Sequence, residues 1–248
     1  MPAHTFKNNF TTNFEYIKAN LPKTHSFTII YTHGLCSSPW GLKPETIKTL
    51  CAEHGLNFLR YEMAGHGSDA ANYEKTNINI WKEQLLELID DMVEGAILLV
   101  GTSMGGWLSL LAAELRPERV IGVVGISSAP DFTVGLEDFY LSAQQKQEIQ
   151  EKGRIEFVTK DFTYIFTSAL LQSGRENQML NRKINIKCPV HLLQGMKDAA
   201  YPWKYSLQIV DCLGGDNVTL KLLKNANHRM QEPEDLKEIC RSVESFIE

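Results

Sequence analysis

The sequence has no long apolar run and no cluster of positive charge, and these absences exclude two classes of protein. No run approaches the roughly 18 apolar residues of a membrane-spanning helix, so we expect no membrane span. Lysine and arginine are dispersed and the formal net charge is -5, which argues against nucleic acid as a partner. The opening stretch MPAHTFKNNFTTNFEYIKANLP lacks a basic start followed by an apolar core, so we expect no signal peptide.

Cysteine is also scarce, and its placement argues against a disulfide framework. The five cysteines have no short regular spacing, which favours free thiols in a reducing compartment and hence a cytoplasmic location. They are Cys36, Cys51, Cys188, Cys212 and Cys240. The sequence contains no H-E-x-x-H motif, no paired Cys/His spacing and no G-x-G-x-x-G after a strand, so neither a metal nor a cofactor is expected.

What the chain does contain is a regular alternation of apolar runs and amphipathic stretches. Runs such as AILLVG and VIGVVGIS are typical of strands that helices cover on both faces. Strands are predicted at 26–32, 57–63, 96–101, 120–127, 189–195 and 218–223, with helices at 42–54, at 78–93 and from Pro233 onward. The alternation predicts an α/β fold, a mostly parallel doubly wound sheet in one domain spanning residues 1–248.

One segment, residues 131–187, breaks this alternation. It mixes many aromatic residues with polar helix formers, which predicts a helical insertion between two strands of the core. Ligands of doubly wound sheets bind beyond the carboxyl ends of the strands, and the insertion leaves the sheet there. We therefore expect a lid over a site with an apolar pocket, although the aromatic residues could equally pack against one another.

A nucleophile is predicted from the motif G-x-S-x-G at residues 101–105, which has Ser103 at its centre. A predicted strand precedes the motif and a predicted helix follows it, which is the context that a nucleophile elbow requires. Such a tight turn strains the serine backbone and exposes its Oγ. The helix N-terminus that follows favours negative charge developing nearby.

A serine hydroxyl needs a base to take its proton, and His228 is the best placed of the seven histidines. It follows the last predicted strand and precedes the last helix. His33 and His66 also follow strands, but each precedes a glycine and suits a tight turn.

The acid that orients this base is expected at Asp198, after the penultimate strand. Ser103, Asp198 and His228 then follow the chain order of hydrolases that carry this elbow. Asp131, after the strand that follows the elbow helix, is the rival, with a helix cap or lid hinge as its other reading. We favour Asp198.

An acyl-transfer reaction also needs donors for the oxyanion of its transition state. The amide of Met104, directly after the nucleophile, is one candidate. The amide of Leu35, in the loop THGLCSSPWG after the first central strand, is the other. Cys36 is adjacent and is a candidate for lining the site, but no base is placed to activate it as a nucleophile.

Together these motifs resemble the α/β-hydrolase superfamily over nearly the whole chain. The stretches HGLCSSPWG, GTSMGGWLSLLAAELRPERVIGVVGISSAPDF, CPVHLLQGMKDAAYPW and VTLKLLKNANHRMQEPEDL resemble bacterial relatives of the mitochondrial depalmitoylating thioesterase group. The resemblance implies a serine esterase or thioesterase for long-chain acyl thioesters and acyl glucuronides, with Ser103, Asp198 and His228 as nucleophile, acid and base. Where many superfamily members carry R-G-H-G-x-S, residues 63–69 read MAGHGSD, without the arginine and with the serine one place early.

The expected function is hydrolysis of carboxylic esters or acyl thioesters through an acyl-serine intermediate. The substrate would be a small-molecule ester or acyl thioester, or an acylated protein. Serine at the elbow excludes dehalogenases and epoxide hydrolases, which carry a carboxylate there. Acyl transfer to an alcohol and hydrolysis of a carbon–carbon bond use the same residues and stay open. A non-catalytic binding module is less expected, because it has no need of all three polar roles.

Overall fold

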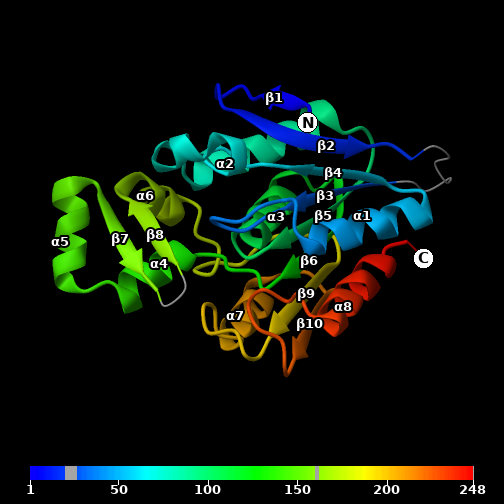
Figure 1. Cartoon of the computed structure of the whole chain (residues 1–248). Helices are drawn as coiled ribbons and strands as arrows, with labels where there is room; N and C mark the ends of the chain where they lie inside the picture. Colours follow the sequence, from blue (N-terminus) through cyan, green and yellow to red (C-terminus); the bar gives the residue numbers. More distant parts are fainter. Residues whose placement is uncertain (20–26, 160–161, 248) are drawn as a thin grey trace.

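The computed structural model describes residues 1–19, 27–159 and 162–247. An eight-stranded sheet forms its centre, in the order β1-β2-β4-β3-β5-β6-β9-β10 (Figure 1). The strands are β1 (Ala3–Thr5), β2 (Thr11–Ile17), β3 (Thr28–Thr32), β4 (Asn57–Tyr61), β5 (Ile97–Thr102), β6 (Val120–Ile126), β9 (Val190–Gly195) and β10 (Val218–Leu223). Ser26, where the first predicted strand begins, lies outside the described residues.

The six strands predicted from apolar runs, β3 to β6 with β9 and β10, pair in parallel and confirm the predicted fold class. The sequence did not predict β1 and β2, which add to one edge in antiparallel fashion. Parallel pairing brings the carboxyl ends of β5, β6, β9 and β10 to the same edge of the sheet, and the candidate site lies there.

Helices cover both faces of the sheet, as the apolar strands predicted. They are α1 (Leu42–His54), α2 (Ile78–Glu87), α3 (Met104–Leu115), α7 (Lys204–Cys212) and α8 (Pro233–Glu244). The helix predicted at 78–93 ends earlier as α-helix and continues as a π-helical turn, η2 (Leu88–Met92). A 3-10 helix, η1 (Gly67–Lys75), follows β4.

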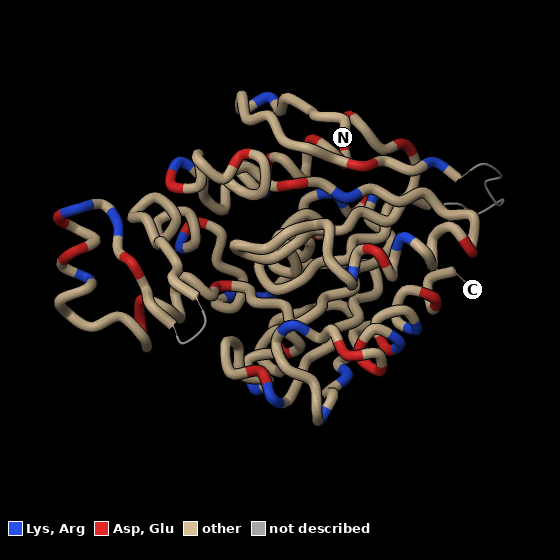
Figure 2. The backbone as a smooth tube through the Cα atoms, in the orientation of Figure 1, with Lys and Arg blue, Asp and Glu red and all other residues tan. Residues whose placement is uncertain are grey.

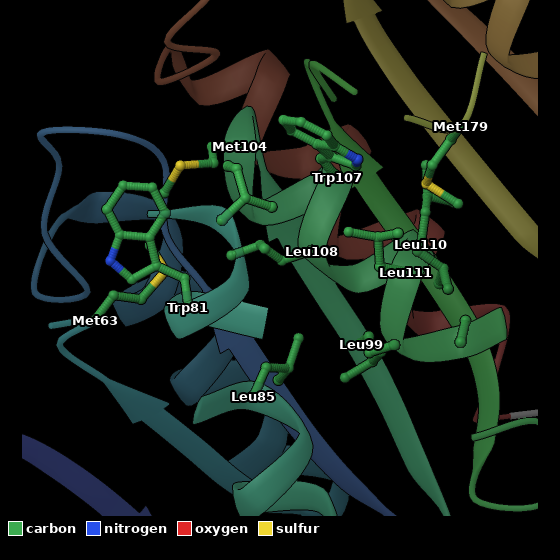
Figure 3. Close-up of a cluster of buried hydrophobic side chains, with 14 of the residues drawn as sticks. Met63, Trp81, Leu85, Leu99, Met104, Trp107, Leu108, Leu110, Leu111 and Met179 are labelled. Carbon is green, nitrogen blue, oxygen red and sulfur yellow. The ribbon is translucent and has the colours of Figure 1, made fainter. Parts of the chain in front are cut away.

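The buried apolar side chains form two clusters, and the central strand β5 contributes to both. Leu99 belongs to a buried cluster with Trp81 of α2 and Trp107 of α3 (Figure 3). Val100, the next residue, belongs to a second buried cluster with Ile239 of α8. Successive side chains of a strand point to opposite faces, so an unbroken apolar run supplies both cores at once and fixes β5 in the middle of the molecule.

The insertion after β6 is not wholly helical, contrary to the prediction. It contains α4 (Phe132–Gly135), a π-helical turn η3 (Leu136–Tyr140), α5 (Ala143–Lys152), the strands β7 (Arg154–Val158) and β8 (Thr163–Thr167), and α6 (Ser168–Glu176). The two strands form an antiparallel hairpin. Aromatic rings pack across it, with the centroids of Phe157 and Phe166 6.1 Å apart. We call residues 131–187 the cap; residues 160–161 of this segment lie outside the described part.

The cap projects from the carboxyl edge of the sheet (Figure 1, left) and is attached to the core by polar contacts. The hydroxyl of Tyr73 in η1 donates to the carbonyl of Ile165, 3.1 Å away. The indole of Trp107 donates to the carbonyl of Asn177 at 3.3 Å, and the ammonium of Lys82 to its side-chain oxygen at 2.6 Å. The base of the cap is therefore tied to α2 and α3.

Charged residues of both signs are interspersed over the same elements (Figure 2). Several form partly exposed ion pairs, such as Arg116 with Asp90 and Arg182 with Glu114. Each such pair contributes at most about 1 kcal/mol, so the two apolar cores carry most of the stability. No helix in the described part of the chain is long and apolar enough to cross a membrane.

Candidate active site

Ser103 lies in a strained turn between β5 and α3. Its backbone has φ 55° and ψ -119°, a conformation that non-glycine residues rarely adopt. The flanking glycines permit the turn. A Cβ on Gly101 would lie 2.3 Å from the carbonyl oxygen of Gly105, and one on Gly105 would lie 2.1 Å from that of Thr32. Strand and helix therefore approach closely, and the turn presents the serine at the carboxyl edge of the sheet.

His228 reaches this serine from the loop between β10 and α8. Its Nε2 lies 3.1 Å from Ser103 Oγ, and its Nδ1 lies 2.7 Å from Asp198 Oδ2. An ionised carboxylate only accepts hydrogen bonds, so the proton of the neutral imidazole sits on Nδ1 and leaves Nε2 as acceptor for the serine hydroxyl. The ammonium of Lys43 on α1 donates to the carbonyl of Arg229 and holds this loop.

Asp198 is buried and its carboxylate is held by four N–H donors. Oδ1 accepts from the amides of Ala200 at 2.9 Å and Tyr201 at 2.8 Å. Oδ2 accepts from the side-chain amide of Gln194 at 2.8 Å and from His228. The Asp198 side chain has no exposed surface. The carboxylate is thus fixed in the one orientation that meets the imidazole.

Asp131, the rival acid, takes a different place. Its carboxylate accepts from the amides of Met179 at 2.9 Å and Leu180 at 2.8 Å, which lie beyond the end of α6. Burial raises the pKa of Asp131, and the two amides partly offset this. Within the described residues Asp131 makes no hydrogen bond to His228. Its side chain does not cap α4 but joins the two ends of the cap segment, and its reading as a lid hinge stays a prediction.

The loop after β3 runs directly beside the nucleophile. A Cβ on Gly34 would lie 3.2 Å from Ser103 Cβ and 3.7 Å from its Oγ. Leu35 follows in this loop, and Met104 opens α3. Both candidate amide donors therefore belong to segments that touch Ser103, and their role toward an oxyanion stays a prediction.

Two buried histidines hold this loop, a role that their reading as turn residues did not predict. His33 Nε2 accepts from the amide of Met63 at 3.1 Å, and His66 Nε2 accepts from the amide of Cys36 at 3.0 Å. The ring centroids lie 4.9 Å apart. Burial, together with the neighbouring His66, lowers the pKa of His33 to about 3. Burial also lowers the pKa of His66. Both rings therefore stay neutral and serve as acceptors that join the loops after β3 and β4.

The turn that departs from the superfamily pattern is organised by Glu62. Its carboxylate accepts from the hydroxyl of Ser68 at 2.6 Å and from the indole of Trp40 at 3.1 Å. A Cβ on Gly67, which has a positive φ, would lie 2.2 Å from the same carboxylate. Ser68, the serine that stands one place early, therefore donates to the buried carboxylate of Glu62. The sequence did not predict this hydrogen bond, because Glu62 lies outside the motif.

Cys36 lies next to the predicted donor Leu35 with a left-handed backbone, φ 50°. The residue is exposed, yet neighbouring groups desolvate its thiol and raise its pKa. A raised pKa disfavours the reactive thiolate, which agrees with assigning the nucleophile to the serine. In the part of the chain that the structure covers, no group of three or more His, Cys, Asp or Glu side chains could hold a metal ion.

The comparisons with known proteins agree with this architecture. The mitochondrial palmitoyl-protein thioesterase ABHD10 of Rattus norvegicus is 34% identical over 223 residues, which is 89% of this chain and 75% of that protein. The solved structure of alpha/beta hydrolase domain-containing protein 10 from mouse has a TM-score of 0.86 at 31% identity, covering 96% of this chain and 94% of that one. A thermostable monoacylglycerol lipase of Bacillus sp. (strain H-257) is 28% identical over 105 residues, 42% of this chain and 41% of that protein.

A family model described as the alpha/beta hydrolase family matches residues 29–240, which include the elbow, the acid and the base. The matched span, the similarity to a thioesterase over most of both chains and the shared parallel sheet agree with one another. The chain belongs to the alpha/beta hydrolase family.

Proposed function

We propose that this hydrolase cleaves carboxylic esters or acyl thioesters through an acyl-serine intermediate. The observation that carries the proposal is the chain of hydrogen bonds from Ser103 through His228 to Asp198. The imidazole lies within hydrogen-bond distance of both the serine hydroxyl and the carboxylate, which supports general-base activation of the serine. The chain's relatives include proteins named as a thioesterase and a lipase, which supports a hydrolytic reaction on an acyl group.

The cycle begins when His228 Nε2 takes the proton of Ser103 as Oγ attacks the acyl carbonyl. The negative oxygen that forms is stabilised by the amides of Leu35 and Met104. The imidazolium then protonates the departing alcohol or thiol, which leaves the acyl group on the serine. In the second half, His228 activates a water that releases the acid and restores the enzyme. Asp198 keeps the imidazole in its tautomer and stabilises its cation.

For the substrate we propose a long-chain acyl ester or thioester, of a small molecule or of an acylated protein. The name of the rat relative supports this choice, and so do the aromatic rings of the cap. Tyr164 stacks on Phe166 on the hairpin, and Tyr73 ties that hairpin to the core, which gives an apolar wall near the carboxyl edge. The cytoplasmic location inferred from the free thiols stays a prediction.

A fluorophosphonate probe tests the nucleophile. It should label the wild-type protein, and Ser103→Ala should abolish both labelling and hydrolysis of p-nitrophenyl esters. Ser242→Ala, on α8 and away from the site, is the matched control and should keep both. A wild-type protein that takes up no probe and hydrolyses nothing would favour a binding module.

A panel of p-nitrophenyl esters and acyl thioesters of increasing length tests the substrate class. We expect kcat/KM to rise with acyl length and both leaving groups to be accepted. Repeating the reactions with an added alcohol separates hydrolysis from acyl transfer, because transfer forms a new ester instead of the free acid. A preference for acetyl groups would contradict the proposed apolar wall.

A further inference from the structure

A buried amide, the side chain of Gln194, lies against the carboxylate of the proposed acid. Gln194 is the second-last residue of β9 and is 1% exposed. Its Nε2 lies 2.8 Å from Asp198 Oδ2, the same oxygen that accepts from His228 Nδ1. A carboxylate only accepts hydrogen bonds. The amide must therefore present its NH₂ group to Asp198, which settles its orientation.

A second element holds this amide in place. The hydroxyl of Ser206 on α7, itself 2% exposed, donates to Gln194 Oε1 at 3.2 Å. The Nε2 group also lies 3.2 Å from the carbonyl oxygens of Gly195 and Tyr201. Every polar atom of Gln194 therefore has a partner. A side chain this constrained cannot turn away from the acid without leaving buried groups unpaired.

We propose that Gln194 is a positioning residue that acts through Asp198 on the imidazole of His228. Its N–H dipole points at Oδ2 and, with the two backbone amides on Oδ1, fixes the plane of the carboxylate. This geometry leaves one direction at Oδ2 open, and His228 Nδ1 occupies it. The inference rests on the proposed function, because a positioned acid matters only if His228 serves as a base.

The first test removes the donor. Gln194→Met keeps the approximate size and removes the hydrogen bond to a charged group, so kcat should fall about tenfold to a hundredfold. KM should stay unchanged, because Gln194 lies behind the acid and not against the substrate. Thermal unfolding and circular dichroism of the variant check that the fold is retained.

The second test replaces the amide donor by a carboxyl group of similar shape. Gln194→Glu places a carboxyl group within hydrogen-bond distance of Asp198, and two such groups do not both ionise readily. The introduced carboxyl group therefore stays protonated and donates to Asp198 Oδ2 in place of the amide, without adding charge beside His228. Its kcat should be restored to within about threefold of wild type, well above that of Gln194→Met. A purely structural role would give the two variants the same kcat.

Gln208→Met is the matched control, since it makes the same substitution at an exposed position of α7 and should leave kcat unchanged. Should Gln194→Met not fold, Ser206→Ala carries the test, because it frees the amide oxygen while Gln194 remains. Its kcat should fall several-fold. Wild-type kcat in Gln194→Met, or in Ser206→Ala where that variant carries the test, would overturn the proposal, as would a folded Gln194→Glu whose kcat is no higher than that of Gln194→Met. A wild-type protein without probe labelling would instead defeat the proposed function itself.

Discussion

At the scale of single residues, the site depends on groups whose protonation is fixed by their surroundings. His33 and His66 stay neutral because water is excluded from both rings. As neutral rings they offer acceptors to the amides of Met63 and Cys36. The loop that carries the candidate donor Leu35 is therefore held by two neutral imidazoles, which accept from backbone amides.

Replacing His66 with phenylalanine should loosen this loop. His66→Phe keeps an aromatic ring but leaves the amide of Cys36 without its acceptor, at a cost of about 1–3 kcal/mol of stability. We expect kcat to fall as well, because the neighbouring amide of Leu35 loses its fixed place. Urea denaturation and p-nitrophenyl ester kinetics measure both effects. His54→Phe, at the end of α1, is the control and should change neither.

The pH dependence of stability should report His33. Its pKa is about 3 in the folded protein and 6.5 in the ordinary case. Between these two pKa values His33 is protonated in the unfolded chain but not in the folded protein. The free energy of unfolding therefore falls as pH falls. The slope from this residue approaches about 1.4 kcal/mol per pH unit. Denaturant melts between pH 7 and pH 4 measure it, and an imidazole ¹⁵N spectrum showing charged His33 at pH 5 would contradict it.

At the scale of elements, the parallel strands were predictable because each is apolar on both faces. The edge strands were not. In β2, TTNFEYI, most side chains are only partly buried, and the alternation of apolar and polar residues is too short to distinguish the segment from a loop. The hairpin was missed for another reason. Strand β7, with Ile155 buried and Glu156 exposed, comes one residue after the helix-forming stretch AQQKQEIQEK of α5. The whole segment was therefore predicted to be helical.

The elbow shows that close packing of two elements, not one residue, positions Ser103. Gly105→Ala would place a methyl group 2.1 Å from the carbonyl oxygen of Thr32. Strand and helix must then separate, at a cost of about 1–3 kcal/mol or more, and probe labelling of Ser103 should be lost. Gly135→Ala is the matched control. Nothing lies within 4 Å of its Cβ position, so a stability equal to or about 0.4–1 kcal/mol above wild type is expected.

The same scale explains how far the candidate site could be predicted. Ser103, Asp198 and His228 each follow a parallel strand, and such loops share one edge of the sheet. The G-x-S-x-G motif, the strand positions and the chain order together therefore favoured their assembly. Nothing in the sequence pointed to Gln194 as a residue of the candidate site. A glutamine near the end of a buried strand is unremarkable until the turn after it folds Asp198 back onto its amide.

At the scale of the whole molecule, the cap is anchored where it meets the core. Asn177, just after α6, donates to Asn79 at 2.8 Å and accepts from Lys82 at 2.6 Å. Both partners belong to α2. The base of the cap is therefore fixed to α2, and its hairpin is held to η1 through Tyr73.

Breaking this anchor should affect long substrates more than short ones. Asn177→Ala removes both contacts to α2, so we expect faster hydrogen exchange in the cap and a higher KM for long acyl chains. Acetyl ester hydrolysis should change little, because the described side-chain hydrogen bonds of Asn177 do not involve the proposed catalytic residues. Asn185→Ala, an exposed residue, is the control. An equal loss on acetyl and long-chain substrates would show that the cap does not discriminate acyl length.

The hydroxyl and the imidazole that meet at the carboxyl edge are 125 positions apart in the chain. During synthesis the elbow emerges first, and its partner arrives only with the final parallel strand, β10. An interrupted or half-folded chain therefore carries Ser103 without its proposed base. The fold thereby makes the assembly of the proposed catalytic residues coincide with the completion of the sheet.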